Sequence, residues 1–456
     1  MQKIKYYSTN LKAGKVSFSE ALLKGIAPDK GLYMPDRIPQ LNKDELASLK
    51  DKPYNEIAFL VLNKFLSEEI SQDELSALVK DAYDFEVPLE HVYDRKYVMR
   101  LDQGPTASFK DFAARMMGLL MHYYLKKERR KLLILTATSG DTGSAIANAF
   151  YDLDNIEVVV LFPEAEVTDR QRKQMTTLEK NIQIIALDGK FDDCQALVKK
   201  AFADNELDYL NLSSANSINV GRLLPQSVFY IYAWARLAGI SQNESVIFSV
   251  PSGNFGDLMG GLIAKRSGIP VKKFVVSTNE NDEFPVYLNS GIYKTIVPSR
   301  NCLSSAMNVG HPSNMARLFA LYNGIMDEKG VVHKAPDIDK IRNDIYSVSV
   351  DDSITKSTIA EAYYKHHLLL EPHGSVGWAG LMEYLKDNPG DNNKEQLCVS
   401  LETAHPAKFP EQIREILSID PVLPTSLTGL DQKKEHFITM NNNFGDFKLF
   451  LKKNYR

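Results

Sequence analysis

The sequence lacks several features that mark particular classes of protein. Its 456 residues include only three cysteines and two tryptophans. So few cysteines argue against a disulfide framework and favour a reducing compartment, so we expect a cytoplasmic protein. No group of His, Cys or acidic residues has the spacing of metal ligands, and we therefore expect no bound metal. The cysteines are also too far apart to form a metal site with one another: they are Cys194, Cys302 and Cys398.

Long hydrophobic runs and an excess of charge are also missing. No stretch approaches the roughly 18 apolar residues of a membrane span, and residues 1–5 lack the apolar core of a signal peptide. The formal net charge is −4, which gives no reason to expect nucleic acid or an anionic membrane as a partner. For self-association we expect a monomer or a homodimer.

What is present is the composition of an ordinary globular protein, with 44% hydrophobic and 25% charged residues. A chain of this length has two or three domains as its prior expectation. The middle of the chain alternates apolar runs with helical periodicity, which predicts a parallel sheet with right-handed crossovers. The expected strands are 132–137, 156–162 and 182–187, and the expected helices are 144–150, 169–178 and 193–202.

The same alternation recurs further along the chain, and a third part lies before both. Strands are expected at 246–250, 273–277 and 396–401, with a helix at 258–265. The predicted fold is therefore α/β, with two three-layer domains whose parallel-rich sheets face a cleft. The predicted division is a mostly helical N-terminal segment (1–95), one α/β domain (96–235) and a second (236–456). Residues 280–345 give no readable pattern, and the last 30 or so are expected to cover a surface.

Lys110 is the first candidate for chemistry. It lies in the stretch 104–114, which opens as a loop and continues as a helix, with Ser108 as the expected N-cap. A cation near a helix N-terminus is disfavoured by the helix dipole, so the amine should lose its proton more easily. A neutral amine can form a Schiff base with a carbonyl compound. The alternative is a solvated surface lysine, which is the ordinary case.

Two loops have the properties of anion sites. Residues 139–143 and 253–257 each follow a predicted buried strand and precede a helix, so backbone N–H groups can face an anion. Neither Gly140 nor Gly143 fits a dinucleotide fingerprint. In the second loop Gly253 and Gly256 allow close backbone approach. Ordinary strand–helix turns remain the alternative for both loops.

Two further segments carry polar groups. Residues 216–222 contain Ser217 and Arg222, and a guanidinium suits a phosphate, with hydroxyl and amide groups completing its shell. A polar loop whose arginine caps its own backbone is the alternative. Thr403 follows a predicted strand and would ordinarily be a strand-end residue. Four further residues beside turns are more often structural than catalytic: Glu371, His373, Glu402 and His405.

A family resemblance joins these pieces. The residues Pro105-Thr106, Ser108-Phe109-Lys110-Asp111 and Ala114 resemble the pyridoxal-phosphate lysine motif of the threonine synthase family, in the tryptophan-synthase-β-like (fold type II) group. Residues 6–9, 18–21 and 31–35 resemble the N-terminal segment of its longer class. The resemblance extends from Tyr6 to Phe409 and implies pyridoxal 5′-phosphate as cofactor.

The resemblance also implies residue roles. Lys110 would carry the cofactor as a Schiff base and act as the catalytic base, Asp141 would lie near the ring hydroxyl, and Thr403 would bond the ring nitrogen. The cofactor phosphate would lie on Gly253, Asn254, Phe255, Gly256 and Asp257. The substrate would be held through its carboxylate by Ser139, Gly140 and Thr142, and through its phosphate by Ser217, Arg222 and Asn254, with Asn219 adjacent.

The implied reaction is the last step of threonine biosynthesis, in which O-phospho-L-homoserine and water give L-threonine and phosphate by β,γ-elimination and replacement. Two alternatives remain open at this point. One is a phospho-lyase or a serine/threonine dehydratase on the same scaffold. The other is a non-catalytic homologue that binds a phosphorylated metabolite, although a binding protein has no need of Lys110.

Overall fold

The computed structural model describes residues 3–455, and its N-terminal part is mostly helical. Two short antiparallel strands, β1 (Tyr6–Ser8) and β2 (Tyr33–Pro35), form a small sheet. Ser17 caps the first helix by accepting a hydrogen bond from the Glu20 N–H at 3.2 Å. The helices of this part are α1 (Phe18–Lys24), α2 (Lys43–Ala47), α3 (Tyr54–Leu66) and α4 (Gln72–Ala82).

The larger of the two main sheets has six strands in the order β13-β10-β9-β14-β4-β3. All neighbours are parallel except β3 and β4, which form an antiparallel hairpin. Central strands such as β9 are buried along their whole length, as expected when helices cover both faces. The strands are β3 (Leu89–Tyr93), β4 (Lys96–Arg100), β9 (Val246–Pro251), β10 (Val271–Thr278), β13 (Ile345–Ser349) and β14 (Leu397–Glu402).

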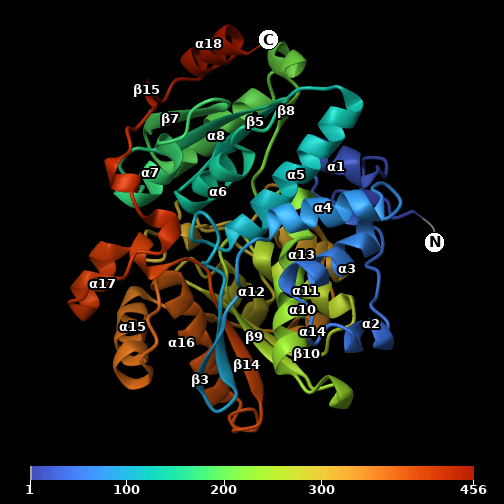
Figure 1. Ribbon diagram of the computed structural model, residues 1–456, viewed down its shortest axis with the longest axis vertical. Helices are drawn as coiled ribbons and strands as arrows, with labels where there is room; N and C mark the ends of the chain where they lie inside the picture. The colour runs from blue at the N-terminus through green and yellow to red at the C-terminus, as the bar shows by residue number, and fades with distance from the viewer. Residues whose placement is uncertain (1–2, 456) are drawn as a thin grey trace.

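The second main sheet has five parallel strands in the order β15-β7-β6-β5-β8. Figure 1 shows it in green above the six-stranded sheet, with the red C-terminal end of the chain at its edge. The strands are β5 (Leu132–Ala137), β6 (Ile156–Pro163), β7 (Ile182–Asp188), β8 (Leu212–Ser213) and β15 (Ile438–Asn441). Its helices include α6 (Asp141–Phe150), α7 (Asp169–Thr176), α8 (Phe191–Phe202) and α18 (Phe444–Asn454).

Helices cover both faces of the six-stranded sheet. Phe248 and Phe274 pack with α10 (Gln226–Leu237) and α11 (Gly256–Arg266), whereas Ile247 and Val275 pack on the other face with α16 (Pro372–Asp387). The long helix α5 (Lys110–Glu128) belongs to the largest apolar cluster. The remaining elements are α9 (Val220–Leu223), α12 (Glu283–Ser290), α13 (Met315–Leu321), β11 (Ile325–Met326), β12 (Val332–Lys334), α14 (Ile338–Asp344), α15 (Asp352–His366) and α17 (Pro410–Leu417).

The predicted fold class is confirmed, with parallel-rich sheets in both halves. Helix starts differ from prediction by a few residues, since α6 begins at Asp141 and α11 at Gly256. The chain also crosses between the sheets more than once, because β4 joins the six-stranded sheet and β15 the five-stranded one. The division at residues 95 and 235 stays a proposal. None of the helices within residues 3–455 is both long and apolar enough to cross a membrane.

Candidate active site

Lys110 is the first residue of α5, and the loop before it is held by side chains rather than by the expected cap. The N-cap is Phe109, which offers no capping side chain, so the prediction for Ser108 is wrong. Asp111 explains the difference. Its carboxylate turns back to accept hydrogen bonds from the Thr106 N–H at 2.9 Å and the Thr106 hydroxyl at 2.5 Å. These bonds stabilise the loop that carries Lys110.

The Lys110 loop also pairs with the segment that follows β14. The Phe109 N–H donates to the Thr403 carbonyl at 2.9 Å, and the His405 N–H donates to the Ala107 carbonyl at 3.0 Å. These backbone bonds bring the beginning of α5 to the carboxyl end of the six-stranded sheet. Residues about 300 positions apart in the sequence therefore become neighbours.

The Lys110 amine faces a buried carboxylate. Its Nζ lies 3.4 Å from Oδ2 of Asp141, at the start of α6. Burial lowers the pKa of Lys110; Lys408 and Arg222 lower it further, and Asp141 opposes them. For Asp141, burial alone would raise the pKa, but the charges of Lys408 and Lys110 hold it well below its usual range. The amine is therefore easier to deprotonate than an exposed lysine, and Asp141 stays charged.

The loop 139–143 is fixed by internal hydrogen bonds and leaves two hydroxyl residues partly exposed. The Thr138 hydroxyl oxygen accepts from the N–H groups of Gly140 at 3.0 Å and Gly143 at 2.7 Å. Gly140 has φ +131°, a conformation that favours glycine, and a Cβ there would lie 2.6 Å from Gln171. Ser139 and Thr142 are only half-buried. Both hydroxyl groups therefore lie on the accessible side of a rigid loop.

The loop 253–257 ends in an uncapped helix. Phe255 is the N-cap of α11 with φ +62° and no capping side chain. Because the first N–H groups of a helix have no backbone partner within it, those of Gly256 and Asp257 are left for a ligand, whereas that of Leu258 is taken by the Asp257 side chain. Asn254 Oδ1 accepts from the Ser313 N–H at 3.3 Å and its hydroxyl at 3.2 Å, so the amide nitrogen of Asn254 is the atom left to donate. A Cβ at Gly253 would meet the backbone of 306–307 at 3.0 Å.

Asp257 lies behind this loop rather than on its accessible side. It is buried, and its Oδ1 accepts the Leu258 N–H at 2.8 Å. Burial raises its pKa to about 7, which is opposed by its own hydrogen bond and by Lys110. A carboxyl group with this pKa is protonated about half of the time at neutral pH, so it repels a neighbouring phosphate less than an ordinary aspartate would.

Arg222 is a buried cation without a salt-bridge partner among the described residues. Its guanidinium donates to the Ala215 carbonyl at 2.9 Å, and its Nε has no partner. Burial lowers the pKa of Arg222 to about 10, while Asp111 raises it. Asn219, by contrast, uses its side chain internally, donating to the carbonyls of Leu22 and Ser214. Arg222 is therefore the residue of this segment that is suited to an anion.

Ser217 is held beside the 253–257 loop by residues of the segment 280–345, which gave no pattern in the sequence. Arg317 donates to the Ser217 carbonyl at 2.9 Å, and Asn314 donates to the Asn254 carbonyl at 2.8 Å. An added Cβ on Gly256 would lie 3.5 Å from Cβ of Ser217. The structure thus brings the 253–257 loop and the 216–222 segment together.

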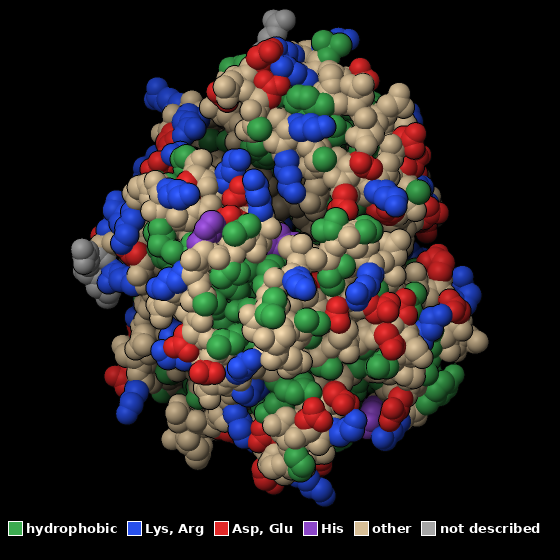
Figure 2. Space-filling model, turned by 180° about the vertical axis from the view of Figure 1, so that it is seen from behind, with side chains coloured by type: hydrophobic (Ala, Val, Ile, Leu, Met, Phe, Trp, Pro, Cys, Tyr) green, Lys and Arg blue, Asp and Glu red, His purple; other side chains and the backbone are tan. Residues whose placement is uncertain are grey.

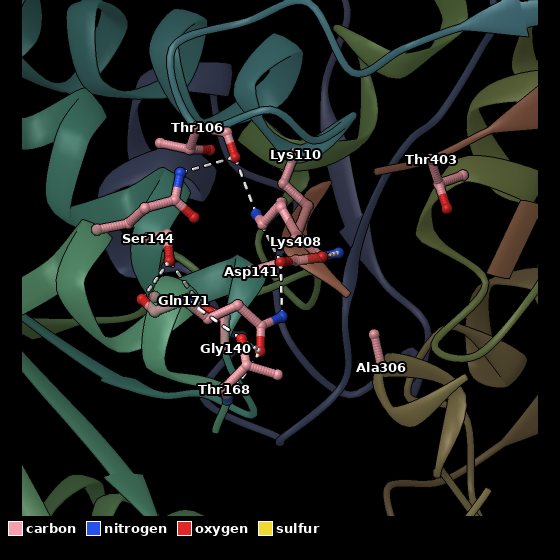
Figure 3. Close-up of polar contacts among 12 residues, drawn as sticks. Thr106, Lys110, Gly140, Asp141, Ser144, Thr168, Gln171, Ala306, Thr403 and Lys408 are labelled. Carbon is pink, nitrogen blue, oxygen red and sulfur yellow. Dashed lines mark hydrogen bonds and ion pairs between the residues drawn. The ribbon is translucent and has the colours of Figure 1, made fainter. Parts of the chain in front are cut away.

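Thr403 belongs to a separate chain of hydrogen bonds, and Figure 3 shows it apart from Lys110, at the right of the view. Its hydroxyl donates to Glu371 Oε1 at 3.4 Å. The same carboxylate lies 2.6 Å from His373 Nδ1, and His373 Nε2 accepts the Ala306 N–H at 3.0 Å. These partners fix His373 with its proton on Nδ1. Glu371 and His373 therefore hold each other and the Thr403 hydroxyl in place through these bonds.

His405 lies near the same segment, in surroundings that disfavour its charged form. Burial lowers its pKa to about 4, with Arg100 and Lys408 acting in the same direction. Its Nδ1 accepts the Ala407 N–H at 3.1 Å. His405 therefore shapes the turn after Thr403, in agreement with the structural role expected for it. Among the described residues no group of His, Cys, Asp and Glu is arranged to hold a metal ion.

The donor set fits a phosphorylated aldehyde such as pyridoxal phosphate. A lysine with a lowered pKa can condense with its aldehyde, the uncapped start of α11 can bind its phosphate, and Thr403 can bond a ring nitrogen. Arg222 Nε, buried and without a partner, is left for a second anion. Figure 2 shows a hollow in the rear face with Lys and Arg side chains at its rim. The arrangement is suited to an anionic ligand.

Sequence reasoning missed four residues that build this site: Gln171, Ser313, Arg317 and Lys408. Each acts through a contact distant in sequence. Gln171 had a local signal, because Thr168 and Gln171 form a capping box at the start of α7. The other three gave no such signal, since a lone Ser, Arg or Lys in an irregular segment is ordinarily on the surface.

Comparison with known families covers nearly the whole chain. Residues 5–83 match the family described as threonine synthase N terminus, residues 88–401 match pyridoxal-phosphate dependent enzyme, and residues 375–450 match threonine synthase, C-terminal. Among curated proteins, a threonine synthase of Haemophilus influenzae is 40% identical, with 96% of this chain and 97% of that protein covered. That of Escherichia coli K12 is 38% identical, with 93% and 94% covered.

Solved structures agree with these matches. A pyridoxal-phosphate-bound threonine synthase from Brucella melitensis superposes with a TM-score of 0.91 at 34% identity and full coverage of both chains. The yeast threonine synthase gives a TM-score of 0.89 at 30% identity, with 98% of each chain covered. A fungal L-serine ammonia-lyase from Rhizomucor miehei gives 0.53 at 12% identity over 73% of this chain and 98% of that one, which shows the shared fold alone.

Proposed function

The chain belongs to the threonine synthase family of pyridoxal-phosphate-dependent enzymes, and from this membership we propose the part that its residues play in the reaction. The reaction converts O-phospho-L-homoserine and water to L-threonine and phosphate. Neither the phospho-lyase nor the dehydratase alternative is favoured, because relatives at 33–40% identity are threonine synthases, whereas deaminases and ammonia-lyases share only the fold. A non-catalytic role is not favoured either, since Lys110 is present and its amine faces the site.

The cofactor is pyridoxal 5′-phosphate, which withdraws electrons from the amino-acid carbons when it is bound. Lys110 would hold it, the start of α11 with Gly253, Asn254, Phe255 and Gly256 would bind its phosphate, and Thr403 would meet its ring nitrogen. Asp141 would lie at the ring hydroxyl. For Asp257 we propose a supporting role, since its carboxyl group is buried and already bonded to Leu258.

The substrate would be oriented by its two anionic ends. Ser139 and Thr142 would hold the carboxylate, because they form the accessible side of a loop at a helix N-terminus, while Gly140, whose N–H already donates to Thr138, would shape that loop. Arg222, Ser217 and Asn254 would hold the phosphate, because Arg222 is a buried cation without a carboxylate partner. The two contacts together fix the chain of carbon atoms between them.

Lys110 is the proposed acid and base. Its Nζ takes the proton from the α carbon of the substrate and returns a proton there at the end of the reaction. The observation that carries this role is the buried amine whose nearest partner, Asp141, lies 3.4 Å away. A lysine with a lowered pKa spends a larger fraction of time neutral and able to accept a proton.

The test is to measure phosphate release and threonine formation from O-phosphohomoserine. We expect equal amounts of both products from the natural enzyme, neither product from Lys110→Ala, and full activity from Lys126→Ala, a control on the exposed face of the same helix. Phosphate accompanied by 2-oxobutyrate would contradict the reaction. Turnover by Lys110→Ala would contradict the role of the lysine.

Location and self-association are proposed more coarsely. We propose a cytoplasmic enzyme, which is supported by three cysteines that are all free and buried. The substrate is a small molecule. A monomer or a homodimer stays the prediction for self-association. Sedimentation equilibrium of the enzyme with its cofactor bound would measure the molecular mass and decide between the two.

A further inference from the structure

Lys408 is a fully buried lysine in the middle of the site. It lies at the end of a short 3₁₀ turn, Pro406–Lys408, just after Thr403, and its side chain has no exposed surface. Its Nζ lies 2.7 Å from Asp141 Oδ1 and donates to the Thr106 carbonyl at 2.8 Å (Figure 3). Because lysine is almost never fully buried without a partner, these two contacts account for its presence.

Asp141 is shared by two ammonium groups, but unequally. Oδ1 is engaged by Lys408 and by the Gln171 amide at 2.8 Å, whereas Oδ2 has Lys110 at 3.4 Å. Gln171 is itself oriented by Thr168, whose N–H and hydroxyl bond to its amide oxygen. Lys408 therefore holds the closer and better-supported contact, and Lys110 holds the weaker one.

Other charged groups near Lys110 do not change this balance. Arg222 is a second cation that acts on Lys110, and Asp257 is a carboxyl group whose pKa burial raises to about 7. Asp111 acts on Lys408 and Arg222, and it is already bonded to Thr106. Asp141 is thus the main negative charge that faces Lys110, and Lys408 competes for it.

We propose that Lys408 is a positioning residue that occupies Asp141 and thereby leaves the Lys110 amine without a close ion pair, so that Lys110 is neutral when it reacts. The proposal rests on the role assigned to Lys110 in the proposed function. A buried site that must lose the charge of one of two lysines loses it at the one with fewer partners. Lys110 has one long contact and Lys408 has two short ones.

A purely structural role for Lys408 predicts something different. The residue also ties the segment 403–408 to the Lys110 loop and to the start of α6, so its loss would cost stability in either case. Only the proposed role predicts a change in the protonation of Lys110. Removing Lys408 takes away a like charge and frees Asp141 to pair with Lys110, and both effects favour the charged amine.

The experiment measures the Lys110 amine directly, without substrate. The full chain freed of cofactor is treated with limiting acetic anhydride between pH 6 and pH 10, and acetylation at Lys110 is quantified by mass spectrometry relative to the exposed Lys126 in the same molecule. We expect Lys408→Met to move the Lys110 curve to higher pH and to lower its rate at pH 7 by about tenfold or more. Lys408→Arg keeps the positive charge, so its Lys110 acetylation should depend on pH in nearly the same way as in the unsubstituted protein.

The outcomes separate the alternatives. An unchanged Lys110 curve in folded Lys408→Met overturns the proposal, and so does an equal shift in Lys408→Arg. Lys408→Gln, which keeps a donor but loses the charge, replaces Lys408→Met if that variant does not fold, and the same shift is expected. Because acetylation needs neither substrate nor turnover, failure here is distinguishable from failure of the Lys110→Ala assay.

Discussion

Cations in this molecule are buried with fewer carboxylates than their charge requires. Arg222 and Arg317 are both buried and bond only to carbonyl and amide oxygens, and Lys110 and Lys408 share Asp141. Burying charge without a counter-ion is costly. On the proposed function, a substrate with a carboxylate and a phosphate would supply negative charge to Arg222 and to the Lys110 side of the site, so ligand binding would relieve part of this cost.

Glu402 is a buried carboxyl group with too few hydrogen-bond donors around it. It is fully buried, its Oε2 has no partner, and Arg100 is 3.6 Å away on the other oxygen. Burial raises its pKa well above the usual 4.5, and Glu371 adds to the effect. The folded state therefore binds a proton more tightly than the unfolded state, and stability falls as pH rises above about 4.5.

Glu402→Gln should remove this dependence. We expect the variant to match the natural protein at pH 4.5 and to exceed it at pH 8 by about 1 kcal/mol or more in the free energy of unfolding. Urea unfolding of both proteins with cofactor bound, at several pH values, measures the difference in their free energies of unfolding. Glu68→Gln, at an exposed position, serves as control and should show no such trend. A constant difference at all pH values would contradict the argument.

At the scale of elements, α13 acts as a connector. Its Arg317 is fully buried and bonds four acceptors from three places: the Tyr33 carbonyl of β2, the carbonyls of 217 and 218, and Asn314. Burial lowers the pKa of Arg317 to about 9, which leaves it charged at neutral pH. The helix therefore holds residues 217–218, in the segment proposed to bind the substrate phosphate, against the N-terminal part of the chain.

Arg317→Met should loosen that connection. It removes the bond to the buried Tyr33 carbonyl, whose loss costs about 1–3 kcal/mol, and the bonds to the half-buried carbonyls of Ser217 and Ile218. We expect a clear fall in the midpoint of thermal unfolding and a raised KM for O-phosphohomoserine, because Ser217 is no longer held. Arg414→Met, which removes an exposed arginine paired with Asp420, should leave both quantities unchanged. A stable Arg317→Met enzyme with the natural KM would show that α13 does not position the site.

Elements with a strong local pattern were predictable, and the connector was not. The mostly apolar run at 132–137 is a fully buried strand, as predicted, because neither face of a parallel strand covered by helices on both sides meets water. Residues 280–345 gave no pattern because their short elements are held by distant contacts, such as Arg317 to β2. Likewise Lys110 was found from a motif, but Lys408 reaches the site only through the fold. The Ser108 cap was not formed: the Ser108 backbone pairs with Ala404, 296 positions away, and its hydroxyl has no partner, which no local pattern indicates.

At the scale of the whole molecule, the end of the chain joins the two sheets. Helix α16 packs on the six-stranded sheet, and β14 is one of its strands. Lys408 comes next and lies in the site. The chain then forms β15, which pairs in parallel with β7 of the five-stranded sheet. The last residues therefore extend a sheet, in addition to covering a surface as expected. One continuous segment links both halves and passes through the site between them (Figure 1).

This link depends on how α18 packs. Phe447 and Leu451 have no exposed surface and pack in one apolar cluster with α8, whereas Leu449, two residues away, is 67% exposed. Phe447→Ala should cost about 3–5 kcal/mol by urea unfolding, because a large buried ring is replaced by a cavity. Leu449→Ala on the same helix should change stability by less than about 0.5 kcal/mol.

Because α18 follows β15 directly, we expect the Phe447→Ala protein to exchange the amide hydrogens of β15 faster, while β14 stays protected. Equal losses from the two variants would show that the C-terminal helix only rests on the surface, and equal exchange in β14 would show that the two sheets unfold as one unit.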